Sequence, residues 1–473
     1  MKKFQLFIVM LVLMGMPAMA FPPSAGAAPS LDGTREITFM NGEVRLTGTL
    51  FLPEGEGPFP AVVLFHGSGP DTRESYFADA KMLQQAGIIA LAYDKRGTGS
   101  STGDWETSSL DDLVADALSG LHTLQTQPEV DPDKVGILGS SQGAYLAPFA
   151  AARDDQVAFI VQVTGSATTL ANQEMWDDGN SLKQLGFSDR AIATEMKALH
   201  MLYSGRDLIR KGILPLGDLW FVYYDPYLDP ADVWPNVNAP ALVLYGGRDM
   251  SVPTRTSLEV VPELLVHPSS RVVVFPDRPH ALGGPSRNDD PVYSSLVTGW
   301  ILAVTNDAPP PEMPFGNQLP DEGNTRWYRV GSQPTRWYNM IHFHLALVIL
   351  FLLSFLCAVV VGLFSKRNVL ARLAFVLTGL VNLAVLVGWG LTVNYLLNAD
   401  ADSASPVLPM GGILPWLAYL SVLLALGLAY LFTRENRRSS LSKGAKFVHG
   451  LVVFATLLFL PFLGYWNLLA GRM

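Results

Sequence analysis

The sequence contains almost no cysteine, and this limits its covalent chemistry. Cys357 is the only cysteine among 473 residues, and it lies within an apolar stretch. A single thiol excludes any intrachain disulfide. Its apolar surroundings predict a small buried hydrophobic side chain rather than a reactive group.

Positive charge is also scarce between residues 21 and 332. This segment has 21 lysines and arginines against 39 aspartates and glutamates, which is a net charge of −18. Nucleic acids and other polyanions bind basic surfaces, so this composition argues against them as partners. Neutral and cationic substrates remain open.

Charged residues are missing altogether from four long apolar runs near the C-terminus. The runs cover about residues 342–364, 373–397, 413–432 and 447–469. A helix needs about 20 apolar residues to span a bilayer, so residues 341–473 are predicted to form an all-α region of four transmembrane helices. Transport and proton relay usually need ionisable groups inside the membrane, so anchoring in the lipid bilayer is the predicted role of this region.

Two histidines, His342 and His344, lie at the outer edge of the first apolar run. They follow Trp337 and Tyr338, an aromatic pair typical of a membrane interface. The histidines are therefore interpreted as interfacial and packing residues. A metal or quinone site built on them is the alternative, and the pattern does not favour it.

Two independent features predict the membrane topology. The loops after the first and third runs are basic, whereas the middle loop has only the acids Asp400 and Asp402, so the positive-inside rule places the basic loops in the cytoplasm. Residues 1–20 have the basic start, apolar core and small-x-small end of a secretory signal peptide. An uncleaved N-terminal anchor is the alternative. Both interpretations place the following domain outside the cytoplasm.

An α/β pattern fills the segment between the signal peptide and the apolar runs. Asn41-Gly42 predicts a β-hairpin. The later strands alternate with helices, which predicts a mostly parallel, doubly wound sheet. We assign residues 21–305 to this domain, about residues 166–238 to a helical cap inserted in it, and residues 306–340 to a Pro-rich linker. The predicted strands are Glu36–Phe39, Val44–Leu52, Ala61–Phe65, Ile88–Tyr93, Val135–Leu138, Phe159–Val163, Ala241–Tyr245 and Arg271–Phe275.

The pentapeptide Gly139-Ser140-Ser141-Gln142-Gly143 is the strongest chemical signal in the chain. It lies between a short apolar strand and the start of a helical pattern, and it has the form G-x-S-x-G. A strand-to-helix turn exposes the serine hydroxyl, and the helix N-terminus presents free N–H groups to a developing anion. Ser141 is therefore the predicted nucleophile.

A serine nucleophile needs a base and an acid that orients the base, and both follow in the expected order. Asp249 comes just past one predicted strand and His280 just past the next, at the edge of the sheet where Ser141 is expected. We predict His280 as the base and Asp249 as its partner. Asp277 is a rival acid, but it is interpreted as a solvated turn residue.

The oxyanion of a tetrahedral intermediate needs preorganised N–H donors. The backbone amide of Gln142, directly after the nucleophile, is one predicted donor. The amide of Ser68, in the loop after the third strand, is the other. His66 in the same loop is interpreted as a bracing residue, because it precedes the serine in the chain.

These motifs together resemble the bacterial α/β-hydrolases of the dienelactone-hydrolase-like and serine-aminopeptidase-like group. The resemblance covers about residues 35–305 and implies the α/β-hydrolase fold, a Ser-His-Asp triad, no metal or cofactor, and hydrolysis of esters, thioesters or occasionally peptides. The four-helix C-terminus departs from the group's pattern. In this resemblance the Asp94–Ser100 segment is a structural turn, with a direct catalytic role for Arg96 disfavoured. The matching segments are His66–Gly69, Asp94–Ser100, Gly139–Gly143, Gly247–Pro253 and His280.

The sequence therefore predicts a serine hydrolase anchored in the bacterial cell membrane, with its catalytic domain on the extracytoplasmic side and a small-molecule ester or acyl compound as substrate. An aminopeptidase-like serine peptidase is the alternative within enzymes, with acidic cap residues binding the substrate's amine. A non-catalytic sensor or assembly protein with a hydrolase-like binding domain is the alternative from another class. The order Ser141, Asp249, His280 along the chain, which is the order expected for a catalytic triad, disfavours the non-catalytic alternative.

Overall fold

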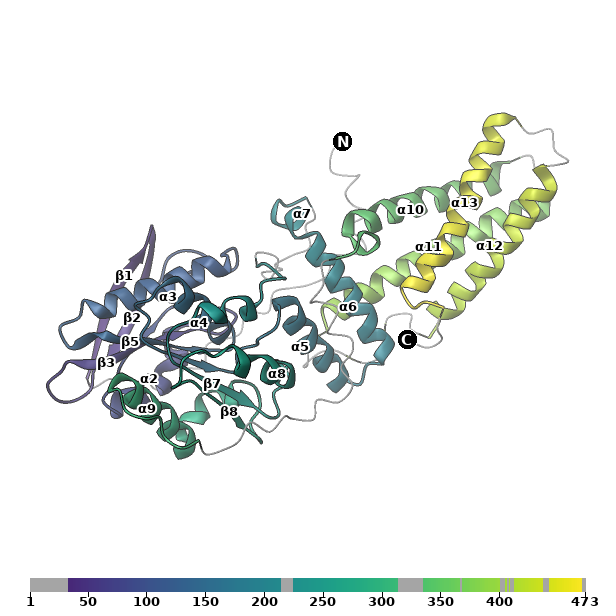
Figure 1. Ribbon diagram of the computed structural model, residues 1–473. Coiled ribbons are helices and arrows are strands. Elements are labelled where there is room, and N and C mark those ends of the chain that lie inside the picture. The colour runs from purple at the N-terminus through teal and green to yellow at the C-terminus, as the bar shows by residue number, and fades with distance from the viewer. Residues whose placement is uncertain are drawn as a thin grey trace. The chain divides into compact units, whose positions relative to one another are not determined.

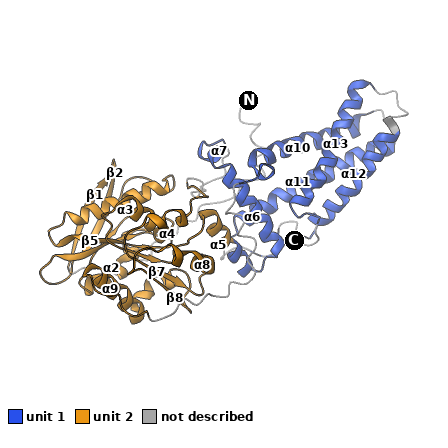
Figure 2. Ribbon diagram, in the orientation of Figure 1, with its two compact units in different colours: residues 1–21, 179–216, 334–473 blue, residues 22–178, 217–333 orange. Residues whose placement is uncertain are grey.

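A computed structural model of the chain describes residues 33–213, 224–313, 335–365, 368–399, 405, 408, 412–436 and 442–469. The chain forms two compact units (Figure 2). The sheet unit contains residues 22–178 and 217–333, and the helical unit contains residues 179–216 and 334–473. The predicted signal peptide and most of the predicted linker lie outside the described residues.

An eight-stranded sheet is the frame of the sheet unit, and it confirms the predicted mostly parallel sheet with an antiparallel start (Figure 1). The strand order is β1-β2-β4-β3-β5-β6-β7-β8. The β1/β2 and β2/β4 pairs are antiparallel, and all pairs from β4/β3 to β7/β8 are parallel. The strands are β1 (Thr34–Asn41), β2 (Val44–Phe51), β3 (Phe59–Phe65), β4 (Ile89–Tyr93), β5 (Val130–Ser140), β6 (Ile160–Val163), β7 (Ala241–Gly246) and β8 (Arg271–Phe275).

Helices cover both faces of this sheet, because side chains along each buried strand point alternately to either side. In β3, Ala61 and Val63 belong to the core under α3, α4 and α8, whereas Val62 and Leu64 belong to the core under α2 and α9. Both faces of the central strands are thus apolar, as the continuous hydrophobic runs predict. The helices are α2 (Phe77–Gln85), α3 (Leu110–Gln125), α4 (Gln142–Arg153), α8 (Thr254–Leu264) and α9 (Pro291–Thr305).

The described parts of the chain between β6 and β7, residues 164–213 and 224–240, are mainly helical. Trp176 and Tyr224 within this segment are buried. The elements are α5 (Leu170–Gln184), α6 (Asp189–Ser204), α7 (Arg206–Arg210), η3 (Pro230–Asp232) and η4 (Trp234–Asn236).

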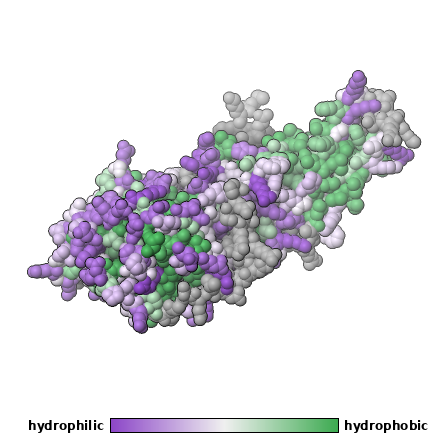
Figure 3. Space-filling model, in the orientation of Figure 1, coloured by the Kyte–Doolittle hydropathy of each residue, from purple (hydrophilic) through white to green (hydrophobic). Residues whose placement is uncertain are grey.

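The helical unit includes four helices that are long and apolar enough to cross a membrane. Hydrophobic side chains cover most of their visible surface in Figure 3. The helix bounds agree with the predicted runs to within one residue except at four ends. Two of these are the end of α12, four residues later than predicted, and the start of α13, four residues earlier. Helix α11 begins before Arg372, whose guanidinium donates to the Gly362 and Leu363 carbonyls at the end of α10, and α13 ends four residues early. The helices are α10 (Ile341–Phe364), α11 (Val369–Leu397), α12 (Leu414–Asn436) and α13 (Lys443–Tyr465).

Polar side chains in these four helices serve packing. The Ser421 hydroxyl donates to the side-chain carbonyl of Asn382, 2.6 Å away, and this bond links α12 to α11. His344 donates from Nε2 to the Tyr338 carbonyl at 3.0 Å. Such bonds stabilise helix contacts within a membrane, so His344 agrees with the interpretation as a packing residue.

Part of the predicted cap packs within the helical unit, which the sequence did not reveal. The Lys197 ammonium, on α6, donates to the Tyr465 carbonyl and to Asn467 beyond the end of α13. The Asn339 side chain bonds Nδ1 of His200 at 3.2 Å. A cation at a helix C-terminus also interacts favourably with the helix dipole. Helix α6 is thus held against the ends of the apolar helices by polar contacts.

The turn between β5 and α4 positions the G-x-S-x-G serine. Ser141 has φ 53° and ψ −115°, a strained conformation for a residue with a side chain. A Cβ atom at Gly143 would overlap the carbonyl oxygen of Phe65 in β3, and one at Gly139 would overlap the backbone of Gly143. Only glycine fits at these two positions, so close packing of strand, turn and helix maintains the strain at Ser141.

This packing predicts a stability difference between two glycine-to-alanine substitutions. Gly143→Ala forces backbone movement and should lower the free energy of unfolding by about 1–3 kcal/mol. Gly299→Ala is the control, because Gly299 lies within α9 with open space around it, and it should stabilise by about 0.5–1 kcal/mol. Thermal unfolding of both variants measures the difference. Equal effects would contradict the crowded-turn account.

Candidate active site

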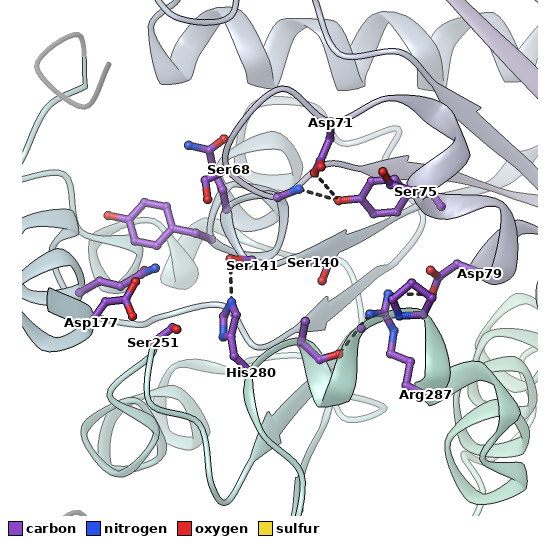
Figure 4. Close-up of a pocket in the computed structure, with 18 of the residues that line it drawn as sticks. Ser68, Asp71, Ser75, Asp79, Ser140, Ser141, Asp177, Ser251, His280 and Arg287 are labelled. Atoms are coloured by element: carbon purple, nitrogen blue, oxygen red, sulfur yellow. Dashed lines mark hydrogen bonds and ion pairs between the residues drawn. The ribbon is translucent and has the colours of Figure 1, made fainter. Parts of the chain in front are cut away.

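The structure brings together the three residues that the sequence predicted as a triad. Nε2 of His280 lies 2.9 Å from Oγ of Ser141. Nδ1 of His280 lies 2.9 Å from Oδ2 and 3.1 Å from Oδ1 of Asp249. Ser141 precedes α4, Asp249 follows β7 and His280 follows β8, so the three residues follow strands that end at one edge of the sheet. Figure 4 shows the bond between Ser141 and His280.

Asp249 is an orienting group with a fixed geometry. Its side chain is fully buried, and Oδ1 accepts hydrogen bonds from the amides of Ser251 and Val252, each at 2.9 Å. A carboxylate is acceptor-only, so Nδ1 of His280 carries the proton toward it. Nε2 is then free of a proton and accepts from the Ser141 hydroxyl. This is the tautomer that a general base needs.

The electrostatics of the site favour a protonated histidine. Burial alone would lower the pKa of His280, but the hydrogen bond and the negative charge of Asp249, together with the charge of Asp177, outweigh it and raise that pKa above its ordinary value. An imidazolium formed during a reaction would therefore be stabilised in place.

The backbone after His280 is unusual, and buried polar contacts hold it. Ala281 and Leu282 have φ of 50° and 53°. The Ala281 amide donates to the Thr164 hydroxyl, and its carbonyl accepts from Arg287, which is itself ion-paired with buried Asp79 at 2.8 Å. These contacts fix the direction in which the imidazole projects.

The two predicted oxyanion donors, Ser68 and Gln142, both line the cavity that contains Ser141. Gln142 is the first residue of α4, where N–H groups have no carbonyl partner within the helix. In the neighbouring loop the Gly67 amide donates to the Tyr76 hydroxyl at 2.6 Å, whereas the described part of the chain offers the Ser68 amide no bonded acceptor. Both amides are thus available at the cavity.

The cavity has a volume of about 550 Å³ and one acidic wall. Glu174 and Asp177, from the first half of α5, line it together with Ser141 and His280. Burial raises the pKa of Glu174 well above its usual range, and burial also raises that of Asp177. Among the described residues neither carboxylate is ion-paired with lysine or arginine. The sequence suggested acidic cap residues in general, but no local pattern singled out these two.

The residues considered as rivals have other roles. Asp277 forms an exposed ion pair with Arg248 at 2.6 Å. His66 is buried, its Nε2 donates to the Tyr93 carbonyl at 2.5 Å, and burial lowers its pKa to about 3. Arg96 is paired with buried Asp116 at 2.6 Å. These contacts agree with the predicted surface, bracing and structural roles respectively.

No cluster of three or more His, Cys, Asp or Glu side chains in the described ranges is arranged to hold a metal ion.

Comparison with known proteins finds a matching family over about half of the chain. Residues 62–294 match the model of the alpha/beta hydrolase family. Over 260 residues the chain is 31% identical to Esterase EstD of Thermotoga maritima, which covers 52% of this chain and 60% of that protein. It is 27% identical over 259 residues to the uncharacterized protein Rv2307c of Mycobacterium tuberculosis, covering 54% of this chain and 77% of that protein.

A third relative has a different activity in its name. The chain is 29% identical over 145 residues to Thiohydrolase aneE of Aspergillus aculeatus, covering 30% of this chain and 45% of that protein. The chain thus covers less than two thirds of the length of two of these three relatives, Esterase EstD and Thiohydrolase aneE. The eight-stranded sheet and its helical layers have the α/β-hydrolase fold.

Proposed function

We propose that this protein is a serine hydrolase that cleaves carboxylic esters or thioesters through an acyl-enzyme. The observation that carries the proposal is the continuous chain of hydrogen bonds from Ser141 through His280 to Asp249. The names of two relatives, an esterase and a thiohydrolase, support this reaction class.

The first half of the reaction forms the acyl-enzyme. Oγ of Ser141 attacks the acyl carbon while Nε2 of His280 takes the hydroxyl proton. Asp249 stabilises the resulting imidazolium. The tetrahedral intermediate then collapses, and His280 gives the proton to the departing alkoxide or thiolate.

The second half releases the acid. A water molecule loses a proton to His280 and attacks the acyl carbon, and the intermediate collapses as Ser141 recovers the proton. In both halves the amides of Ser68 and Gln142 would bind the oxyanion. Such donors act mainly in the transition state, where they are worth several kcal/mol.

The proposal includes a location for the reaction. The basic loops and the N-terminal apolar segment support a multi-pass protein of the bacterial cell membrane with the sheet unit outside the cytoplasm. The four apolar helices support membrane association.

Replacing the nucleophile gives the direct test. Ser141→Ala should abolish covalent labelling by a fluorophosphonate probe and cleavage of short p-nitrophenyl esters. Ser140→Ala is the matched control, since this neighbouring serine has no bond to His280, and it should retain labelling. An alanine variant at position 141 that labels and turns over like the wild type would refute the assignment.

The environment of His280 predicts a pH dependence. The base works only when neutral, and its pKa is raised, so kcat/KM should rise with pH through that raised value. Asp249→Asn removes the carboxylate charge that raises the pKa. This substitution should shift the acidic limb of the pH–rate profile to lower pH. It should also reduce the value of kcat at the plateau of that profile on the order of 10⁴-fold. An unchanged limb in this variant would exclude Asp249 as the orienting acid.

The acidic wall of the cavity favours a second candidate, an aminopeptidase-like serine peptidase. Glu174 and Asp177 line the same cavity as the serine, and neither is ion-paired with a lysine or arginine among the described residues. A substrate ammonium would supply that partner and compensate the buried negative charge.

Aminoacyl naphthylamides and neutral acyl esters distinguish the candidates. If Glu174 binds an amine, Glu174→Gln should raise KM for the aminoacyl substrate about tenfold, which corresponds to about 1.4 kcal/mol, and leave the neutral ester unchanged. Since a carboxylate with a raised pKa is neutral at low pH, this selectivity should grow as pH rises. Efficient cleavage of neutral esters alone, unaffected by the substitution, would reject the peptidase.

A further inference from the structure

The segment Asp94–Ser100 is a motif that the triad does not use, yet it lies under the loop that carries Ser68. Asp94 is buried after β4, and its carboxylate accepts from the Arg73 amide at 3.0 Å and from the Ser100 amide at 2.8 Å. The Thr98 hydroxyl donates to the Asp71 carbonyl at 2.8 Å. The segment therefore supports the loop from residue 67 to residue 73.

Lys95 makes the most specific contact in this support. Its side chain is buried, and its ammonium donates to the carbonyls of Gly67 and Gly69 at 2.8 and 3.0 Å and to Oε1 of Gln142 at 3.0 Å. An ammonium has three N–H donors. All three are matched by acceptors, and these acceptors belong to the two segments that carry Ser68 and Gln142.

We propose that Lys95 is a positioning residue that fixes the two oxyanion donors, the amides of Ser68 and Gln142, relative to each other. The inference rests on the proposed hydrolase function. It concerns how the donors are held, and it assigns Lys95 no contact with the substrate.

The geometry of the peptide bond determines the direction of the first donor. In a trans peptide the carbonyl of one residue and the N–H of the next point in opposite directions. The Gly67 carbonyl points at the Lys95 ammonium, so the Ser68 N–H points away from Lys95. Ser68 lines the cavity with Ser141, and both are labelled in Figure 4. Lys95 thereby sets the direction in which this amide donates.

The second donor is held through its own side chain. Gln142 is buried as the first residue of α4, and Lys95 binds its side-chain oxygen. One ammonium therefore connects the loop after β3 to the helix that follows the nucleophile. Hydrogen-bond donors that stabilise a transition state must be held within about 0.5 Å of the positions that the reaction requires. The Lys95 ammonium restrains both amides, because it binds both segments that carry them.

The charge of Lys95 has a second effect on the donor. A cation bound to an amide carbonyl polarises the amide, which strengthens its N–H as a donor in a site of low dielectric constant. Burial lowers the pKa of Lys95 to about 8, although the charges of Asp71 and Asp116 act to raise it. At neutral pH the side chain therefore remains mainly an ammonium with three donors.

The neighbouring cation provides a matched control. Arg96 is also buried, but it binds Asp116 and Ser108 and the Asp112 carbonyl, away from the Ser68 loop and from Gln142. Both substitutions, Lys95→Met and Arg96→Met, remove a buried cation from one turn and should destabilise the protein. Only the first should disturb the oxyanion donors.

The experiment uses the full-length protein in detergent, with active sites counted by fluorophosphonate titration carried to completion. Steady-state cleavage of a short p-nitrophenyl ester gives kcat and KM, and a trifluoromethyl ketone, which forms a tetrahedral oxyanion adduct, reports transition-state binding. Lys95→Met should lower kcat per active site about 10- to 100-fold and weaken ketone binding similarly, with KM within twofold of the wild type. Arg96→Met should lower Tm with kcat per active site within twofold.

A second variant keeps the test decisive if Lys95→Met does not fold. Gln142→Met removes the side-chain oxygen that Lys95 binds, together with the side chain's hydrogen bond to Tyr224, and keeps the backbone amide; it should lower kcat about tenfold at constant KM. Combined with Lys95→Met, it should lower kcat by much less than the product of the two single effects, because the bond between Lys95 and Gln142 is already broken in either variant.

Two outcomes separate the inference from the function on which it rests. The positioning role would be overturned if Lys95→Met keeps the wild-type kcat and ketone affinity, or if Gln142→Met keeps them when Lys95→Met does not fold. In that case an inactive Ser141→Ala variant would still support the hydrolase function. A wild-type protein with neither ester cleavage nor labelling would overturn the proposed function itself.

Discussion

Close backbone packing at the turn between β5 and α4 is the constraint on which the candidate site depends. There is no space for a side chain at Gly139 or Gly143, so strand and helix approach until Ser141 is held at positive φ. That conformation projects the hydroxyl toward His280 and places the Gln142 amide at a helix N-terminus. The positions of the candidate nucleophile and of one candidate oxyanion donor therefore both depend on the lack of space at Gly139 and Gly143.

Buried charge organises the remainder of the site, and each buried ion in it has a defined partner. Asp249 is satisfied by His280 and two amides, and Arg287 by Asp79. Lys95 is satisfied by three oxygen acceptors. A buried charge without partners would cost several kcal/mol, so these groups tolerate little displacement. The acidic wall of Glu174 differs in lacking a basic partner among the described residues, which makes it the natural place to look for substrate selectivity.

The helical unit shows a different balance of forces. Apolar helices gain little from packing in lipid, and the contacts that join them include small residues and polar bonds such as that between Ser421 and Asn382. Gly379 packs closely against the backbone of Phe355, which lets α10 and α11 approach. Beyond the helix ends, Lys197 and His200 of α6 replace apolar packing with hydrogen bonds. The segment that the sequence assigned to a cap of the sheet domain thus contributes to this unit.

The sequence by itself determined the elements and the candidate nucleophile. Strands, amphipathic helices and spanning helices are visible locally, because periodicity and apolar length require only neighbouring residues. Ser141, Asp249 and His280 were predictable because each follows a strand and parallel strands end at the same edge. Tertiary structure alone decided what faces the serine and what supports it: Glu174 on the cavity wall and Lys95 beneath the donor loop depend on which distant segments meet. Such contacts are set by packing in three dimensions, and no local pattern of residues encodes them.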